Sequence, residues 1–299
     1  MKKYIIIYLT FLVAFSQHST SQVGTSGISF LKIGVGARSL AMGDVMTLDK
    51  SDPSSIYYNP ATMGLSNNSM LMLMHREWIE DTRTEYFGAL LPAGKFRFGV
   101  GLNLTSIDNI EIRTVPGPSQ GTFSSKNSTL GLSASYGFDN ILFGFTGKFL
   151  YEKILIDEAT GYALDIGAVY ITPWMFQVGL AINNIGSMNK LRNESSTLPT
   201  MIRIGGSKVF NFEDINSAVV AVTEFVSVFK EQKSHIHIGT EFCYQDMFSL
   251  RAGIQTNYQS RFFSTGVGFK HGIFAVDYAF VPFQYDFGST HIISVIINL

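Results

Sequence analysis

The chain has 299 residues, a formal net charge of −1 and 46% hydrophobic residues, but only 15% charged residues. Ordinary soluble domains carry roughly 25% charged residues, so much of this surface is expected to face something other than water. The small net charge provides no basic field to attract nucleic acid, and the only cysteine, Cys243, excludes an intramolecular disulfide.

The first residues have the pattern of a secretory signal peptide. Lys2 and Lys3 precede an apolar run at 4–15, and a small, polar segment follows at 16–22. The apolar run is too short to span a bilayer as a helix, and no later stretch reaches 18 consecutive apolar residues. We expect residues 1–22 to direct export and then to be removed.

Residues 23–68 do not alternate as a strand would and are rich in turn signals. Asp52 followed by Pro53 favours the start of a short helical turn. Asn59 followed by Pro60 predicts a turn and disfavours helix at Asn59. A segment of about 45 residues is too small to fold alone, so it needs a larger domain to pack against.

From Ser69 onward the chain consists of alternating runs separated by turn residues, which is typical of transmembrane strands. The pattern predicts about fourteen strands. Their expected ranges are 69–78, 84–91, 96–106, 127–138, 141–154, 161–171, 175–183, 200–210, 216–228, 234–244, 248–257, 262–270, 273–281 and 290–299.

The connections alternate between short and longer segments, as in outer-membrane barrels. Short ones follow the even strands, for example 92–95 and 139–140, and longer ones follow most odd strands, for example 107–126, 184–199 and 282–289. The final run at 290–299 could by itself be a core strand of a soluble β-sandwich. Pairing with the first strand to close a barrel explains it better. With the first strand running outward, the order of short and longer connections places both termini in the periplasm.

One face of the predicted strands is apolar and is assigned to lipid, while the other is assigned to the lumen. Charges at mid-bilayer on the lipid face would cost about 2–4 kcal/mol each for Arg or Lys. Glycines also concentrate at the strand positions assigned to the lumen, which indicates that another segment packs closely against the barrel wall. We therefore predict an all-β transmembrane antiparallel barrel at 69–299, with 23–68 as a plug in its lumen. The expected lumen charges, which would form an internal ion-pair network, are Arg97, Lys148, Glu152, Asp165, Arg203, Glu241, Arg251 and Asp277.

The stretch from Phe30 to Asp44, followed by Tyr58-Asn59-Pro60-Ala61, resembles the N-terminal signature of the PorV/PorQ family. That family is similar to the FadL long-chain fatty-acid transporter group, with fourteen strands and an N-terminal hatch. The resemblance implies an outer-membrane component of the type IX secretion system, whose members bind C-terminal signal domains of exported cargo or belong to the attachment machinery. The residues expected to form the plug motif are Gly34, Gly36, Arg38, Met42, Gly43, Asn59, Pro60 and Ala61.

Each candidate site also has an ordinary structural interpretation. Asn59 could anchor the plug to the wall or form a local Asx turn. The glycines near Arg38 lack the strand–loop–helix context of a phosphate loop, and Arg38 is expected to pair with a lumen carboxylate. His235, His237 and Glu241 could share a strand face, but no further metal ligand is evident, so we expect polar lumen residues. No nucleophile–base pattern indicates an enzyme, and no metal or cofactor is expected.

An apolar composition in the outer loops suggests a surface for a protein partner, although the same residues could pack on the barrel rim or fold into the lumen. The candidate partner-binding residues are Trp78, Ile79, Ile110, Ile112, Val115, Pro116 and Phe123. The leading hypothesis is a monomeric barrel that binds type IX cargo or secretion-machine subunits within a larger complex. The alternative is a FadL-like transporter of hydrophobic small molecules, and a purely structural subunit is the third possibility.

Overall fold

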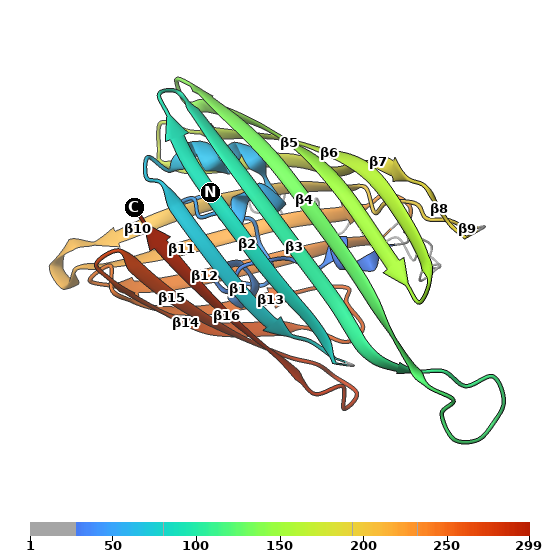
Figure 1. Ribbon diagram of the computed structural model, residues 1–299. Helices are drawn as coiled ribbons and strands as arrows, with labels where there is room; N and C mark the ends of the chain where they lie inside the picture. Colours follow the sequence, from blue (N-terminus) through green and yellow to red (C-terminus); the bar gives the residue numbers. More distant parts are fainter. Residues whose placement is uncertain (1–27, 80, 193, 232) are drawn as a thin grey trace, which may run out of the picture.

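A computed structural model describes residues 28–79, 81–192, 194–231 and 233–299, so the expected signal peptide at 1–22 lies outside the described residues. Fourteen antiparallel strands form a closed barrel, which confirms the predicted fold class (Figure 1). The barrel strands are β1 (Met70–Glu77), β2 (Thr82–Ala93), β3 (Phe96–Glu111), β4 (Thr122–Phe138), β5 (Ile141–Ile154), β6 (Asp157–Ile171), β7 (Phe176–Met188), β10 (Met201–Phe212), β11 (Ser217–Val228), β12 (Lys233–Tyr244), β13 (Phe248–Gln255), β14 (Phe263–His271), β15 (Phe274–Pro282) and β16 (Ser289–Asn298).

Neighbours in sequence are neighbours in the barrel, except that β7 pairs with β10 because β8 (Lys190–Leu191) and β9 (Glu194–Ser195) form a separate small sheet. β1 pairs with β16 to close the ring, and the backbone N–H of Leu299 donates to the carbonyl of Ser69 at 2.8 Å. Closure removes both sheet edges, which explains why an uncharged apolar strand can end the chain.

The two ends of the barrel differ in their connections. We call one the turn end, where short connections such as 94–95 and 139–140 lie and where β1 begins and β16 ends. We call the other the loop end, which carries 112–121, 189–200, 256–262 and 283–288. The longest connections therefore gather at one rim, as predicted, although 155–156 between β5 and β6 is as short as the turns of the other rim.

The expected loop at 107–126 is wrong in its extent, because β3 continues to Glu111 and β4 begins at Thr122. A bulge near Asn109, whose φ is 57°, shifts the register, and Ile110 then pairs with Phe123. β2 begins opposite Ile107 and β5 ends opposite Ser125, so the hairpin continues past both neighbours. Its tip at 112–121 projects from the loop end (Figure 1).

Outward side chains are mostly apolar, as in Leu132 and Phe143, which are 60% and 53% exposed. Some charged or titratable side chains outside the expected lumen set point outward, among them His75, Glu77 and Glu85 on β1 and β2. These residues lie toward the loop end of their strands, where an apolar band would give way to a polar boundary.

Residues 28–68, which we call the plug, lie inside the barrel (Figure 1). The plug contains η1 (Ser29–Lys32), α2 (Ala37–Ala41), α3 (Ser55–Tyr58) and η2 (Pro60–Leu65). η1 lies near the loop end, where Lys32 pairs with Glu231, and η2 lies near the turn end, beside Leu142. No helix among the described residues has the length and apolar character needed to cross a membrane.

Candidate functional site

Wall glycines allow the plug to lie directly against the strands. An added Cβ at Gly99 would come within 2.8 Å of Ile56, and one at Gly179 within 2.6 Å of Leu48. Glycine in a strand interior has no side chain to pack and lowers strand stability, but at these positions it allows close contact with the plug. The other wall glycines whose Cβ position meets plug atoms include Gly144, Gly167, Gly239, Gly253 and Gly266.

Asn59 fulfils both roles considered for it. Its side-chain oxygen accepts from the backbone N–H of Ala61 at 3.0 Å, which caps η2. Its amide nitrogen donates to the wall carbonyls of Ala168 and Leu180 at 3.4 and 3.3 Å. The side chain occupies the space that a Cβ at Gly167 would need. Asn59 is therefore a turn residue that also fixes the plug against β6 and β7.

Arg38 joins the plug to the wall through a buried network near the turn end. Its guanidinium donates to both oxygens of Glu241, at 2.9 and 3.1 Å, and to Asp49 at 2.7 Å. Arg251 donates to Glu241 at 2.5 Å and to Asp277 at 2.7 Å. Lys50 lies 3.6 Å from Glu241, so three cations and three carboxylates form one charge-balanced cluster that joins the plug to the strands.

The surroundings of the charged plug residues shift their pKa values. Burial by itself lowers the pKa of Arg38, but the carboxylates of Asp49 and Glu241 more than offset this effect and raise it above its ordinary value. Burial raises the pKa of Asp52, although Ser54 donates to its carboxylate through the backbone N–H at 2.7 Å. Arg38 is therefore firmly cationic, whereas burial disfavours the ionised form of Asp52.

Two further buried pairs lie in the loop-end half of the wall. Lys148 binds Asp165 at 2.6 Å, and Arg203 binds Glu224 at 3.0 Å. Glu224 also accepts from the plug backbone N–H of Met46 at 3.0 Å. Glu224 is not among the lumen charges expected from the sequence, because β11 is apolar on both faces and its inward face is ambiguous.

Arg76 is a second wall residue that the sequence analysis did not identify. It is 1% exposed and donates to the plug carbonyl of Gly34 at 2.8 Å and to Thr84 at 2.8 Å. Its guanidinium also lies 4.9 Å from the centre of the Trp78 ring, a cation–π distance. The alternation of polar and apolar residues that would reveal Arg76 is obscured, because the inward residues before it on β1 are methionines that pack on the plug.

The remaining expected lumen charges behave differently from one another. Arg97 lies at the turn end, where it donates to the carbonyl of Ser66 and to the side chain of Asn67, both at 2.5 Å. Glu152 lies toward the loop end, is 7% exposed, and its Oε2 has no hydrogen-bond partner.

The glycine motif of the plug has a conformational explanation. Gly36 and Gly43 have φ of 85° and 83°, in the region that favours glycine. A Cβ at Gly34 would collide with the hydroxyl of Tyr58, which donates to Asp44 at 2.7 Å. Met42 packs in an apolar cluster with Val45, Val220 and Val222.

The two histidines make hydrogen bonds separately. His235 Nδ1 lies 3.0 Å from the carbonyl of Thr256, and His237 bridges the carbonyl of Asp44 and the hydroxyl of Tyr258, at 3.1 and 3.2 Å. Glu241 binds the two arginines instead. Within the described ranges, no group of three or more His, Cys, Asp or Glu residues could hold a metal ion.

The candidate partner-binding residues do not form one exposed surface. Trp78 packs edge-on against Phe283 with ring centres 5.0 Å apart, and it is half-buried at the rim. Val115 is 63% exposed on the hairpin tip. Ile79, Ile110, Ile112 and Phe123 are half-buried and Pro116 is exposed.

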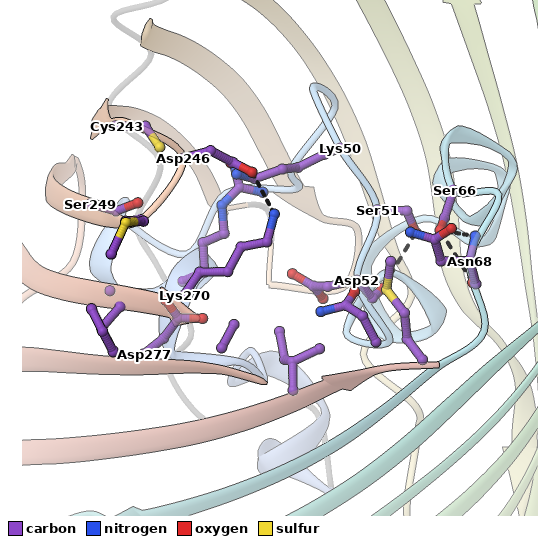
Figure 2. Close-up of a pocket in the computed structure, with 18 of the residues that line it drawn as sticks. Lys50, Ser51, Asp52, Ser66, Asn68, Cys243, Asp246, Ser249, Lys270 and Asp277 are labelled. Atoms are coloured by element: carbon purple, nitrogen blue, oxygen red, sulfur yellow. Dashed lines mark hydrogen bonds and ion pairs between the residues drawn. The ribbon is translucent and has the colours of Figure 1, made fainter. Parts of the chain in front are cut away.

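A cavity of about 430 Å³ lies at the turn end between the plug and the wall. Figure 2 shows side chains gathered around it from the plug, including Lys50 and Asp52, and from the wall, including Cys243 and Lys270. Charged groups of both signs line it, and Lys270 pairs with Asp246 at 2.5 Å. Apolar side chains such as Leu65 and Ile296 also line it, so the cavity has a mixed polar and apolar surface.

An apolar cluster occupies the opposite, loop-end part of the lumen. Ile28, Phe30 and Leu31 of the plug pack against the wall residues Leu150 and Ala163, with Leu198 of a loop-end connection completing the cluster. The loop-end part of the lumen thus holds an apolar contact zone beside two buried ion pairs, and the turn-end part holds the larger charged network and the cavity.

Comparison with family models and with curated proteins yields no match. Solved structures do match: the toluene transporter TodX of Pseudomonas putida has 14% identity and a TM-score of 0.66, covering 89% of this chain and 97% of its own. The toluene transporter TbuX of Ralstonia pickettii has 16% identity and a TM-score of 0.60, with the same coverage. A FadL homologue of Pseudomonas aeruginosa has 11% identity and a TM-score of 0.53, covering 94% and 99%. The chain therefore has the fold of FadL-like outer-membrane barrels.

Proposed function

We propose that this protein moves small hydrophobic molecules across the outer membrane, with its loop end outside and its turn end in the periplasm. The observation that carries the proposal is the apolar cluster between η1 and the wall, formed around Phe30, Leu31 and Leu150 near the loop end. Its fold is also the one that the toluene transporters TodX and TbuX share. The proposal involves binding and passage without a catalytic step.

In this mechanism a ligand enters from the loop end and replaces contacts that Phe30 and Leu31 make with the wall. Burying apolar surface gives about 25 cal/mol per Å², which favours uptake from water. Further movement requires the plug to shift, because Arg38 and Asn59 bind it to the strands. In the turn-end cavity, charged side chains such as Lys50 and Asp52 stand beside apolar ones such as Ile296, so an apolar ligand binds there less tightly than in the all-apolar cluster, which favours release.

The test compares uptake of radiolabelled toluene by cells that do or do not carry the protein in their outer membrane. The Leu31→Asp variant places a charge in the apolar cluster, and Leu155→Asp, at a 48% exposed loop-end position, is the matched control. We expect faster uptake with the wild-type and control proteins and its loss with Leu31→Asp. Equal uptake with and without the wild-type protein contradicts the proposal, and heat-modifiable migration in gels verifies folding of each variant.

A second candidate is protein binding in the type IX secretion system, as the resemblance of the plug motif implies. The projecting hairpin with its exposed Val115 supports this candidate, since it extends past the neighbouring strands β2 and β5. Gentle solubilisation followed by pull-down and mass spectrometry tests it. Co-purification of exported proteins that share a C-terminal β-domain, lost on deletion of 112–121, supports the candidate; recovery of the barrel alone contradicts it.

A further inference from the structure

Four polar side chains on the inner wall of β3, β4 and β5, three buried and one half-buried, carry buried atoms without a hydrogen-bond partner. Asn103, Thr129 and Glu152 are 3%, 5% and 7% exposed. Both amide atoms of Asn103, Oδ1 of Asn127, Oγ1 of Thr129 and Oε2 of Glu152 are without a partner. Buried polar groups are ordinarily hydrogen-bonded, so several unsatisfied neighbours call for an explanation.

These side chains form one continuous patch. Asn103 lies directly opposite Thr129, and Asn127 lies directly opposite Glu152. Inward residues on the same strand are separated by two positions, so Thr129 and Asn127 are neighbours on β4. Opposed residues place their Cβ atoms about 4.5–5.5 Å apart, close enough for one small ligand to contact the whole patch.

The patch carries a negative charge with no ion pair in the described parts of the chain. The nearby cations on β5 are engaged elsewhere, since Lys148 binds Asp165 at 2.6 Å and Lys153 binds Glu158 at 3.5 Å. The next inward residue on β5 is Leu150, which belongs to the apolar cluster with Phe30. An anionic acceptor with amide and hydroxyl groups therefore adjoins an apolar surface.

We propose that this patch binds a primary amine with an apolar body. The ammonium group donates to Glu152 and to the Oδ1 of Asn127, and the body packs against Leu150 and the apolar cluster. Asn103 and Thr129 add hydrogen bonds to any hydroxyl that the ligand carries. This site goes beyond the proposed passage of hydrophobic molecules because it selects an amine. Leu150 is 1% exposed, so the apolar body reaches it by displacing plug residues of the apolar cluster.

The test uses three probes of nearly equal size: 2-phenylethylamine, 2-phenylethanol and phenylacetate. Each is titrated calorimetrically into the detergent-solubilised protein, with empty micelles subtracted. We expect saturable binding of the amine, at least tenfold weaker binding of the alcohol, and none of phenylacetate. Glu152→Gln weakens amine binding at least tenfold, whereas Glu158→Gln, at an exposed carboxylate bound by Tyr151, leaves it unchanged.

Equal binding of the three probes, no saturable binding of the amine, or full affinity in Glu152→Gln each overturns the proposal. If Glu152→Gln does not fold, Asn127→Ala is measured instead, with the same expected loss of amine affinity. Toluene uptake in the Glu152→Gln variant separates the two proposals. If Glu152→Gln still takes up toluene but no longer binds the amine, both proposals stand. If the wild-type protein takes up no toluene, only the transport proposal is contradicted.

Discussion

Replacing Glu241 with Gln tests whether the buried ion pairs hold the plug in the lumen. The Glu241 carboxylate is fully buried and accepts hydrogen bonds from Arg38 at 2.9 and 3.1 Å and from Arg251 at 2.5 Å. Removing one partner of a buried pair costs about 3–5 kcal/mol. Because Arg38 keeps Asp49 and Arg251 keeps Asp277, we expect the lower end, about 3 kcal/mol.

The assay uses a cysteine placed in the plug. Cys243 is half-buried and lines the turn-end cavity, so it is replaced with Ser in every protein that is compared. Ser39→Cys then puts the thiol at a plug position that is 0% exposed, and its reaction with a charged thiol reagent reports displacement of the plug. When local opening is fast compared with labelling, the labelling rate follows the open population. A loss of about 3 kcal/mol raises that population roughly 100-fold, since each 1.4 kcal/mol is a factor of ten.

The control is Glu158→Gln, which removes an exposed pair with Lys153 and is expected to change the rate by less than about fivefold. Labelling of each protein in denaturant corrects for intrinsic thiol reactivity. A wild-type labelling rate in Glu241→Gln would refute the reasoning, because the network would then contribute little to retention of the plug.

Three further predictions use the same labelling assay. Gly253→Val should displace the plug, because its Cβ position is filled by plug backbone, whereas Gly147→Val has no neighbour within 4 Å and should not. Asn59→Ala should cost about 2 kcal/mol by removing the cap and the wall bonds. Asn59→Asp keeps the cap but buries a carboxylate oxygen against the carbonyls of Ala168 and Leu180, so it should cost more than Asn59→Ala. Asp52→Asn should slow labelling at neutral pH. Burial raises the pKa of Asp52 above its ordinary value of 3.8, so the ionised carboxylate destabilises the folded state above the raised pKa. Acidification toward pH 3.8 protonates the carboxylate and relieves this penalty. The Asp52→Asn variant should therefore lose this pH dependence between pH 3.8 and neutrality.

The barrel wall could be predicted because alternation is a local property of the chain. In β5, Phe143 and Phe145 face outward while Gly144 and Thr146 face inward, and the residue period alone assigns those faces. The signal weakened where the plug makes the inward face apolar. On β1 the inward residues Met72 and Met74 pack on the plug, so both faces read as apolar and Arg76 was overlooked.

The sequence could also predict that Arg38 needs a carboxylate and that Asn59 begins a turn, because each follows from a residue type in its local setting. It could not predict the extent of the β3–β4 hairpin, since the bulge at Asn109 moves the pairing beyond the point where regular alternation ends.

The sequence by itself determined the periodic wall, its order of strands and the presence of a segment that must pack inside it. Only the tertiary structure decided which groups meet there. Arg38 and Glu241 are 203 residues apart, and Asn59 reaches carbonyls more than 100 residues away. Such partners depend on barrel closure and on how the plug is seated, neither of which a local residue pattern encodes. The unpartnered Glu152 became visible for the same reason, since its neighbours come from three strands.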